Sequence, residues 1–76
     1  MSANGTLQPH QQRVVDERNE LEKKWSALGV FTNGGEGSIF AGLDEAEQTR
    51  LVCQYRFMGG YLDMLNSRID AFGASA

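Results

Sequence analysis

The longest apolar repeat in the chain lies in residues 44–72, which read DEAEQTRLVCQYRFMGGYLDMLNSRIDAF. Apolar residues alternate there at spacings of four and three, a pattern typical of the buried seam of a long amphipathic helix. Asp44 followed by Glu47 resembles a capping box, and Gly73 stands where glycine commonly ends a helix. The pattern predicts a helix over 44–72. Its seam consists of Leu51, Tyr55, Met58, Leu62, Leu65, Ile69 and Phe72.

A shorter helix is predicted N-terminal to this one, over residues 9–28. Pro9 suits the first helical turn, where its missing N–H would lack a partner in any case, and Gly29 is predicted to end the helix. The seam repeats at the same spacings. It consists of Val14, Arg18, Leu21, Trp25 and Leu28. The ends of the chain, 1–8 and 73–76, are expected to be flexible.

The connector between the helices, residues 29–43, contains turn-forming sequence. Residues 33–37 read NGGEG, in which glycine supplies the backbone freedom that a tight turn needs. We expect a mobile tip there, followed by one short helical turn over about 38–41. That turn would fold Phe40 and Leu43 over the end of the hairpin as a lid.

These elements predict one all-α domain over 9–72, folded as an antiparallel two-helix hairpin. Pairing Trp25 with Tyr55 brings the two seams into register and places Val14 near Leu65. At 76 residues the chain is short for a self-sufficient core, because small domains bury a smaller fraction of their surface.

The second helix carries another apolar row beside its seam, with Phe57, Tyr61 and Met64 following Val52 and Cys53. One partner helix cannot cover both rows, and an exposed apolar patch commonly marks an interface. The sequence therefore predicts a homo-oligomer that completes a helical bundle, most simply a symmetric dimer. The alternative is a monomer in which the 30–43 segment covers the row. The candidate interface residues are Val52, Phe57, Gly60, Tyr61 and Met64.

Two adjacent glycines, Gly59 and Gly60, interrupt the middle of the second helix. Together they cost about 2 kcal/mol relative to alanine, so a use for the missing side chains is expected. Three explanations are open: close packing of the Trp25 indole or of a symmetry-related helix, a kink, or access of a ligand to the backbone.

Catalytic signatures are missing from the sequence. His10, the only histidine, is near the N-terminus, whereas the predicted register places Cys53, the only cysteine, at the opposite end of the hairpin. The carboxylates lie on solvated helix faces, and the glycines of 34–37 lack the lysine and hydroxyl residue of a phosphate loop. We therefore expect no enzymatic activity, no catalytic residue, no metal site and no cofactor.

Arginine and tyrosine side chains provide chemistry for binding an anionic ligand. Guanidinium groups beside aromatic rings bind phosphates and stack on bases. The alternative is that the arginines form ion pairs with acidic neighbours and cover apolar surface with their stems. Those neighbours are Asp63, Asp70, Glu17 and Glu22. The candidate ligand-binding residues are Arg13, Arg18, Tyr55, Arg56, Tyr61 and Arg68.

The charge balance restricts the partners. Ten acidic and seven basic residues give a net charge of -3, which argues against DNA, RNA or an acidic membrane because phosphate contacts need a basic face. No apolar run approaches the length of a transmembrane helix, and residues 1–12 lack the regions of a signal peptide. A cytoplasmic protein is expected.

Several of these positions together resemble a family of very short helical-hairpin proteins from tailed phages and prophages. The first helix carries QRVxDExxEL at residues 12–21, and the second carries LxxQxxxMxxYxxxLxxRI at residues 51–69. The chain departs from that family in the insertion at 33–37 and in Gly59-Gly60. The resemblance implies a protein that binds a component of a host defence inside the infected cell, and it transfers no site residue. In architecture the hairpin is also similar to phage sponge proteins, oligomers of helical hairpins that sequester cyclic-nucleotide immune signals.

Three functions follow as expectations. The first is a phage-encoded, non-enzymatic oligomer that counters an antiviral defence by sequestering a nucleotide immune signal. The second is a protein-binding inhibitor of a host nuclease or RNA-guided effector, with the acidic helix faces as a nucleic-acid mimic. The third is an accessory of virion assembly or structure, with the hairpin docked in a groove of another protein.

Overall fold

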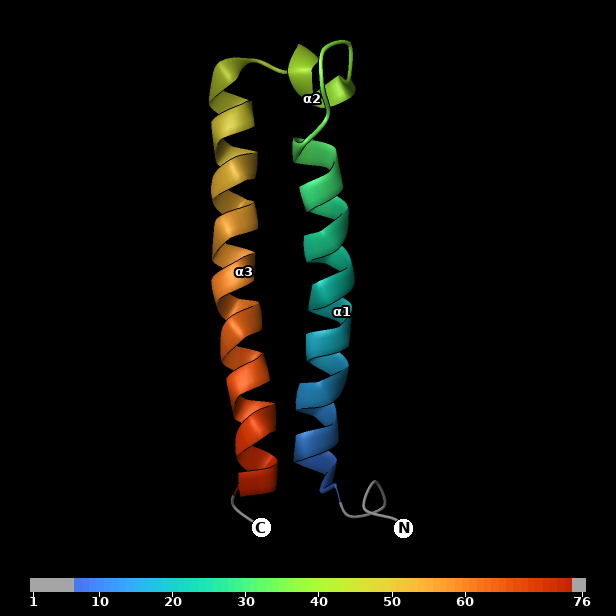
Figure 1. The fold of residues 1–76 in the computed structure, drawn as a ribbon, viewed down its shortest axis with the longest axis vertical. Helices are drawn as coiled ribbons and strands as arrows, with labels where there is room; N and C mark the ends of the chain where they lie inside the picture. Colours follow the sequence, from blue (N-terminus) through green and yellow to red (C-terminus); the bar gives the residue numbers. More distant parts are fainter. Residues whose placement is uncertain (1–6, 75–76) are drawn as a thin grey trace.

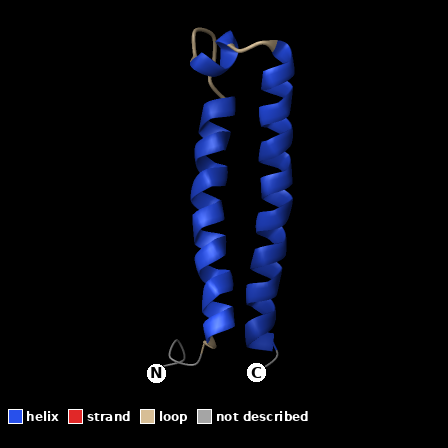
Figure 2. Ribbon diagram, turned by 180° about the vertical axis from the view of Figure 1, so that it is seen from behind, coloured by secondary structure: helices blue, strands red, loops and turns tan. Residues whose placement is uncertain are grey.

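The computed structural model describes residues 7–74 and confirms the predicted all-α class. Two long helices, α1 (Pro9–Thr32) and α3 (Glu45–Ala74), lie side by side and antiparallel, and the short α2 (Ile39–Gly42) sits at their joined end (Figure 1). Within the described residues the secondary structure is helical throughout, with loops only next to α2 and before α1 (Figure 2). The hairpin is a rod with extents of 50 × 18 × 16 Å.

Capping contacts explain where the long helices begin. α1 begins at Pro9, as predicted, and the backbone N–H of Gln8 donates to Oε1 of Gln11 at 2.9 Å. α3 begins after Asp44, whose Oδ1 accepts a hydrogen bond of 2.7 Å from the backbone N–H of Glu47. The Asp44 contact satisfies an N–H group that has no partner within the helix. The negative charges of Glu45 and Glu47 in this first turn interact favourably with the helix dipole.

The predicted end of the first helix at Gly29 is wrong, because α1 continues to Thr32. Gly29 is buried within the helix, and a Cβ atom on it would lie 2.8 Å from Cε1 of Tyr55. The glycine therefore permits close approach of the Tyr55 ring instead of terminating the helix. α1 ends before Asn33, whose backbone N–H donates to the Gly29 carbonyl oxygen at 3.1 Å.

The remaining boundaries lie close to the predicted ones. α2 begins one residue after the start of the predicted 38–41 turn, and α3 continues through Gly73 to Ala74 instead of ending at 72. Gly37 has a φ of 87°, a conformation that favours glycine, and it turns the chain into α2. Of the ends expected to be flexible, residues 1–6 and 75–76 lie outside the described part of the chain, so that expectation stays a prediction.

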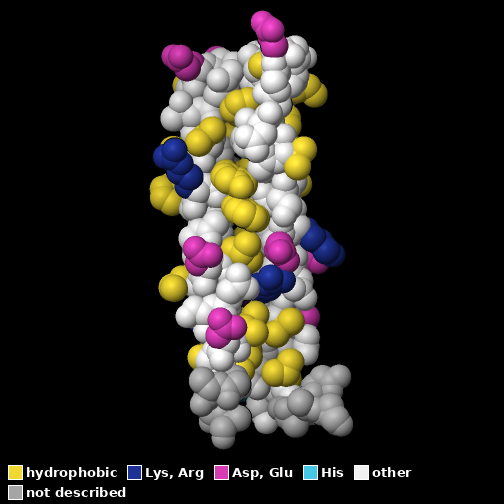
Figure 3. Space-filling view, in the orientation of Figure 1, with side chains coloured by type: hydrophobic (Ala, Val, Ile, Leu, Met, Phe, Trp, Pro, Cys, Tyr) yellow, Lys and Arg dark blue, Asp and Glu magenta, His cyan; other side chains and the backbone are white. Residues whose placement is uncertain are grey.

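The core is a narrow seam between α1 and α3. Val14, Leu62 and Leu65 are its buried apolar residues among those described, and Leu65 is fully buried. Farther along the seam, the rings of Trp25 and Tyr55 stack with centroids 5.1 Å apart and planes 8° from parallel, which confirms the predicted pairing of these two residues. Figure 3 shows apolar side chains running along the line where the two helices meet.

Aromatic packing closes the joined end of the hairpin. The rings of Phe31 and Phe40 meet edge to face with centroids 5.9 Å apart, so Phe40 folds back over the end of α1 as predicted. Ser38 caps α2 by accepting the Ala41 N–H at 3.1 Å. From α3, Nε2 of Gln48 donates to the carbonyl oxygens of Phe40, Ala41 and Leu43 at 3.0–3.2 Å. These contacts attach α2 to both long helices.

The two adjacent glycines of α3, Gly59 and Gly60, have different surroundings. A Cβ on Gly59 would lie 3.1 Å from Nε1 of Trp25, whereas a Cβ on Gly60 would meet nothing within 4 Å. Close packing of the Trp25 indole therefore explains Gly59. The same explanation does not reach Gly60, which faces away from the indole and is exposed.

Replacement of Gly29 by alanine tests whether this close approach matters. Helix propensity alone would stabilise G29A by about 1 kcal/mol, but overpacking of a fitted contact costs about 1–3 kcal/mol. We expect a net loss of about 1 kcal/mol in the free energy of unfolding, measured by urea denaturation with circular dichroism. S26A, at an exposed position of the same helix, is the control and should change stability by only a few tenths of a kcal/mol. A gain of stability in G29A would contradict the packing role.

Candidate functional site

An exposed apolar row lies along one face of α3. Phe57 is 77% exposed, Met64 60% and Tyr61 46%, and their spacing places them within about 60° around the helix axis. The connector does not cover this row, so the alternative in which the 30–43 segment shields it is wrong: Phe40 packs against Phe31 instead. The row is therefore available to a partner.

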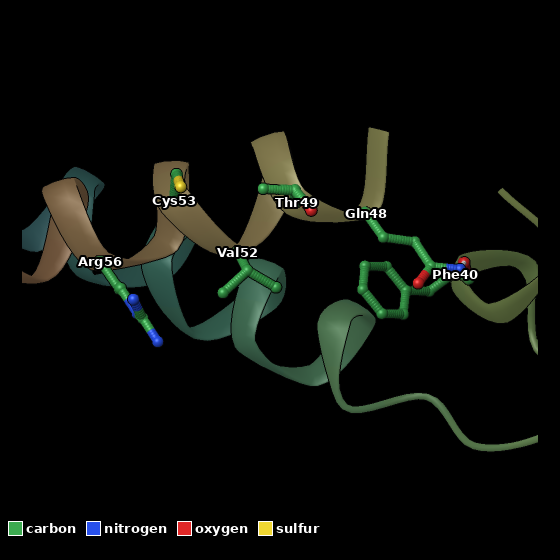
Figure 4. A pocket seen from close by; sticks show the side chains of 6 residues that line it. All are labelled: Phe40, Gln48, Thr49, Val52, Cys53 and Arg56. Atoms are coloured by element: carbon green, nitrogen blue, oxygen red, sulfur yellow. Dashed lines mark hydrogen bonds between the residues drawn. The ribbon is translucent and has the colours of Figure 1, made fainter. Parts of the chain in front are cut away.

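Two other residues predicted for the interface occupy different surroundings. Gly60 is exposed, open to the surface, and adjacent to the row. Val52 is half-buried and lies about 140° around the axis from Phe57, facing the α2 end (Figure 4). The structure thus groups Phe57, Gly60, Tyr61 and Met64, and it separates Val52 from them.

Two of the six candidate ligand residues are engaged in holding the hairpin together. The Arg18 guanidinium donates to Oδ1 of Asn66 on α3 at 2.8 Å and pairs with Glu22 at 2.7 Å, with a further contact to Asn19. Tyr55 is stacked on Trp25 and lies against Gly29. Both side chains are half-buried, and both contribute contacts between the two long helices.

The other four candidates are exposed. Within residues 7–74, the guanidinium groups of Arg13, Arg56 and Arg68 form no ion pair, and only Arg18 takes one of the acidic partners named above. Arg68 shares its face of α3 with Tyr61, because the two are seven residues apart and differ by about 20° around the axis. Arg56 lies about 18 Å along the helix from Arg68 and on a different face, so the structure does not bring the two arginines together.

A hollow that the sequence analysis missed lies between α2 and α3. Its volume is about 410 Å³, and Figure 4 shows the side chains around it. Helical spacing in α3 gave no signal for this hollow, because its far wall comes from α2 and depends on the hydrogen bonds of Gln48. The lining residues are Phe40, Gln48, Thr49, Val52, Cys53 and Arg56.

Groups that could serve catalysis or metal binding are dispersed. His10 lies in the first turn of α1, at the end of the hairpin away from α2, and Cys53 lies in the third of α3 nearer α2, so the two residues are far apart along the hairpin. Among the residues that the structure describes, no group of three or more histidine, cysteine, aspartate or glutamate side chains is placed to hold a metal ion. Neither long helix has an apolar stretch that would let it cross a membrane.

Comparison with known families matches this hairpin to one family. The model of the Sequestin family matches residues 8–71, which include α1, α2 and nearly all of α3. The chain belongs to the Sequestin family. No curated protein and no solved structure shows a significant match to this chain.

Arginine variants separate structural from available side chains in this Sequestin-family hairpin. R18A removes the hydrogen bond between the helices and the Glu22 ion pair, so we expect the free energy of unfolding to fall by about 1–2 kcal/mol. R13A, at an exposed position of the same helix, should change it by less than about 0.5 kcal/mol. Urea denaturation of both variants under identical conditions gives the comparison, and equal stabilities would refute the structural role of Arg18.

Proposed function

We propose that this member of the Sequestin family is a non-enzymatic binding protein that sequesters a nucleotide immune signal. In this proposal the protein is phage-encoded and acts in the cytoplasm of the infected cell, where it lowers the free concentration of the signal and so counters an antiviral defence. It works as a homo-oligomer of helical hairpins, and no bond of the ligand is made or broken.

The exposed row of Phe57, Tyr61 and Met64 carries the proposal. A hairpin with so thin a core gains stability when a second copy buries this row, because burial of apolar surface contributes about 25 cal/mol per Å². Packing of α3 against its symmetry mate would give a four-helix bundle, a common arrangement for two such hairpins. Exposed Gly60, beside the row, would allow the two helices to approach closely.

The family name supports sequestration as the activity. A sequestering protein needs affinity and abundance, and it needs no catalytic group. Three exposed arginines outside ion pairs support an anionic ligand, since guanidinium groups bind phosphate in two-pronged hydrogen bonds. Tyr61 offers a ring on which a base can stack.

Light scattering tests the oligomer. We expect the purified protein to have a solution mass that is a multiple of 8.4 kDa. F57E places a charge in the apolar row and should return the mass to that of a single chain with helical content retained. V30E is the matched control, because Val30 is 78% exposed and lies on α1 outside the row. A single-chain mass for the wild type at high concentration would exclude this assembly.

Thermal unfolding tests the ligand class. A ligand that binds only the folded state raises the melting temperature, and at about 100-fold excess over Kd it adds about 2.7 kcal/mol to stability. We expect at least one cyclic or linear nucleotide to raise the melting temperature when supplied near 1 mM. No shift across the panel would remove nucleotide capture. Co-purification of a stoichiometric host nuclease or defence effector, without an ultraviolet-absorbing small molecule, would favour protein inhibition instead.

A further inference from the structure

The hollow between α2 and α3 has walls that the fold holds in place. Gln48 donates to the carbonyl oxygens of Phe40 and Ala41 in α2 and of Leu43 directly after it, and the Phe40 ring packs edge to face against Phe31. The Ser38 cap adds a third restraint on α2. A ligand entering this hollow would meet Phe40 and Gln48 already in position, so less free energy is lost on ordering that wall.

Its lining combines one cation with apolar surface. Arg56 stands at one end, is exposed, and has no ion pair within the described chain. Phe40 and Val52 supply apolar contact toward the other end, and Figure 4 shows Val52 between Arg56 and Phe40 on the same side of α3. No carboxylate lines the hollow, so a phosphate bound there meets no repelling charge from its walls.

We propose that this hollow is a binding site for one nucleotide unit, with a single phosphodiester on Arg56 and the base against Phe40 and Val52. The inference rests on the proposed function and names the site at which it would operate. The hydroxyl of Thr49 is available to donate to the phosphate or the ribose.

The size and charge of the hollow set the ligand class. Its volume of about 410 Å³ lies in the lower part of the range for small-molecule sites, about 300–1,000 Å³, and the hollow is open to solvent. One guanidinium balances one phosphodiester, which carries a single negative charge. That chemistry is shared by a cyclic mononucleotide and by one half of a cyclic dinucleotide.

Isothermal titration of cyclic AMP and of cyclic di-AMP into the purified full chain tests the site. Loss of a charge-assisted hydrogen bond should make R56A bind about tenfold or more weakly than the wild type, with R56K between them. K23A removes one positive charge from an exposed position on α1 outside the hollow, and its affinity should stay within about twofold of wild type. Light scattering of R56A must give the wild-type mass, so that a loss of affinity is not a loss of assembly.

Cys53 provides a second readout, because it is the only cysteine in the chain and lines the hollow. A bound nucleotide should slow alkylation of its thiol by iodoacetamide several-fold, and the same nucleotide concentration should give less protection in R56A. Protection of Cys53 by cyclic AMP or by cyclic di-AMP supports the site. Which of the two protects shows whether the bound unit is a cyclic mononucleotide or one half of a cyclic dinucleotide.

The failures of the two proposals are distinguishable. Nucleotide binding that is equal in wild type and R56A and leaves Cys53 unprotected would overturn the hollow as the site, while nucleotide sequestration would stand. If R68A weakened binding and R56A did not, the site would lie beside Tyr61 on the apolar row. Failure of the wild type to bind any nucleotide would overturn the proposed function itself.

Discussion

The stack of Trp25 on Tyr55 is the contact on which the hairpin depends. It joins the two long helices in the half of the hairpin nearer α2, and it fits because each helix presents a glycine to the ring of the other: Gly29 to Tyr55 and Gly59 to Trp25. Two flat rings with centroids 5.1 Å apart bury more apolar surface than any aliphatic pair at that point could. The indole Nε1 is buried there and has no hydrogen-bond acceptor among residues 7–74, so the packing of the ring compensates for one missing hydrogen bond.

This contact sets the thickness of the molecule and leaves an apolar face of α3 uncovered by α1. Helices held so closely leave room for only one layer of side chains, so the faces of α3 that point away from α1 stay at the surface. The row of Phe57, Tyr61 and Met64 is the apolar part of that remainder. Arg68 lies on the same face of α3 as Tyr61, whereas Arg56 lies on a different face and Arg13 lies on α1. The proposed association and anion capture are based on this surface.

Periodicity in the sequence was enough to predict the hairpin, its register and the exposed row. These features depend on side chains repeated along one helix, and spacing reports such repeats directly. Gly29 was misread because a glycine that ends a helix and a glycine that admits a neighbouring ring are identical in sequence; only the position of Tyr55 distinguishes them. The hollow could not be predicted, since it forms where Gln48 ties a four-residue helix to α3. Of the predicted ligand residues, Arg18 and Tyr55 make contacts between the helices that spacing along one helix could not show, because their partners, Asn66 and Trp25, come from the opposite helix.

The stacked indole also gives the protein a built-in optical reporter. Trp25 is the only tryptophan in the chain, so all indole fluorescence comes from the contact between α1 and α3. Separation of α1 from α3 would expose the Trp25 ring to water and shift its emission to longer wavelength. The intrinsic fluorescence of the unmodified polypeptide therefore follows opening of the hairpin in its half nearer α2, without an attached dye.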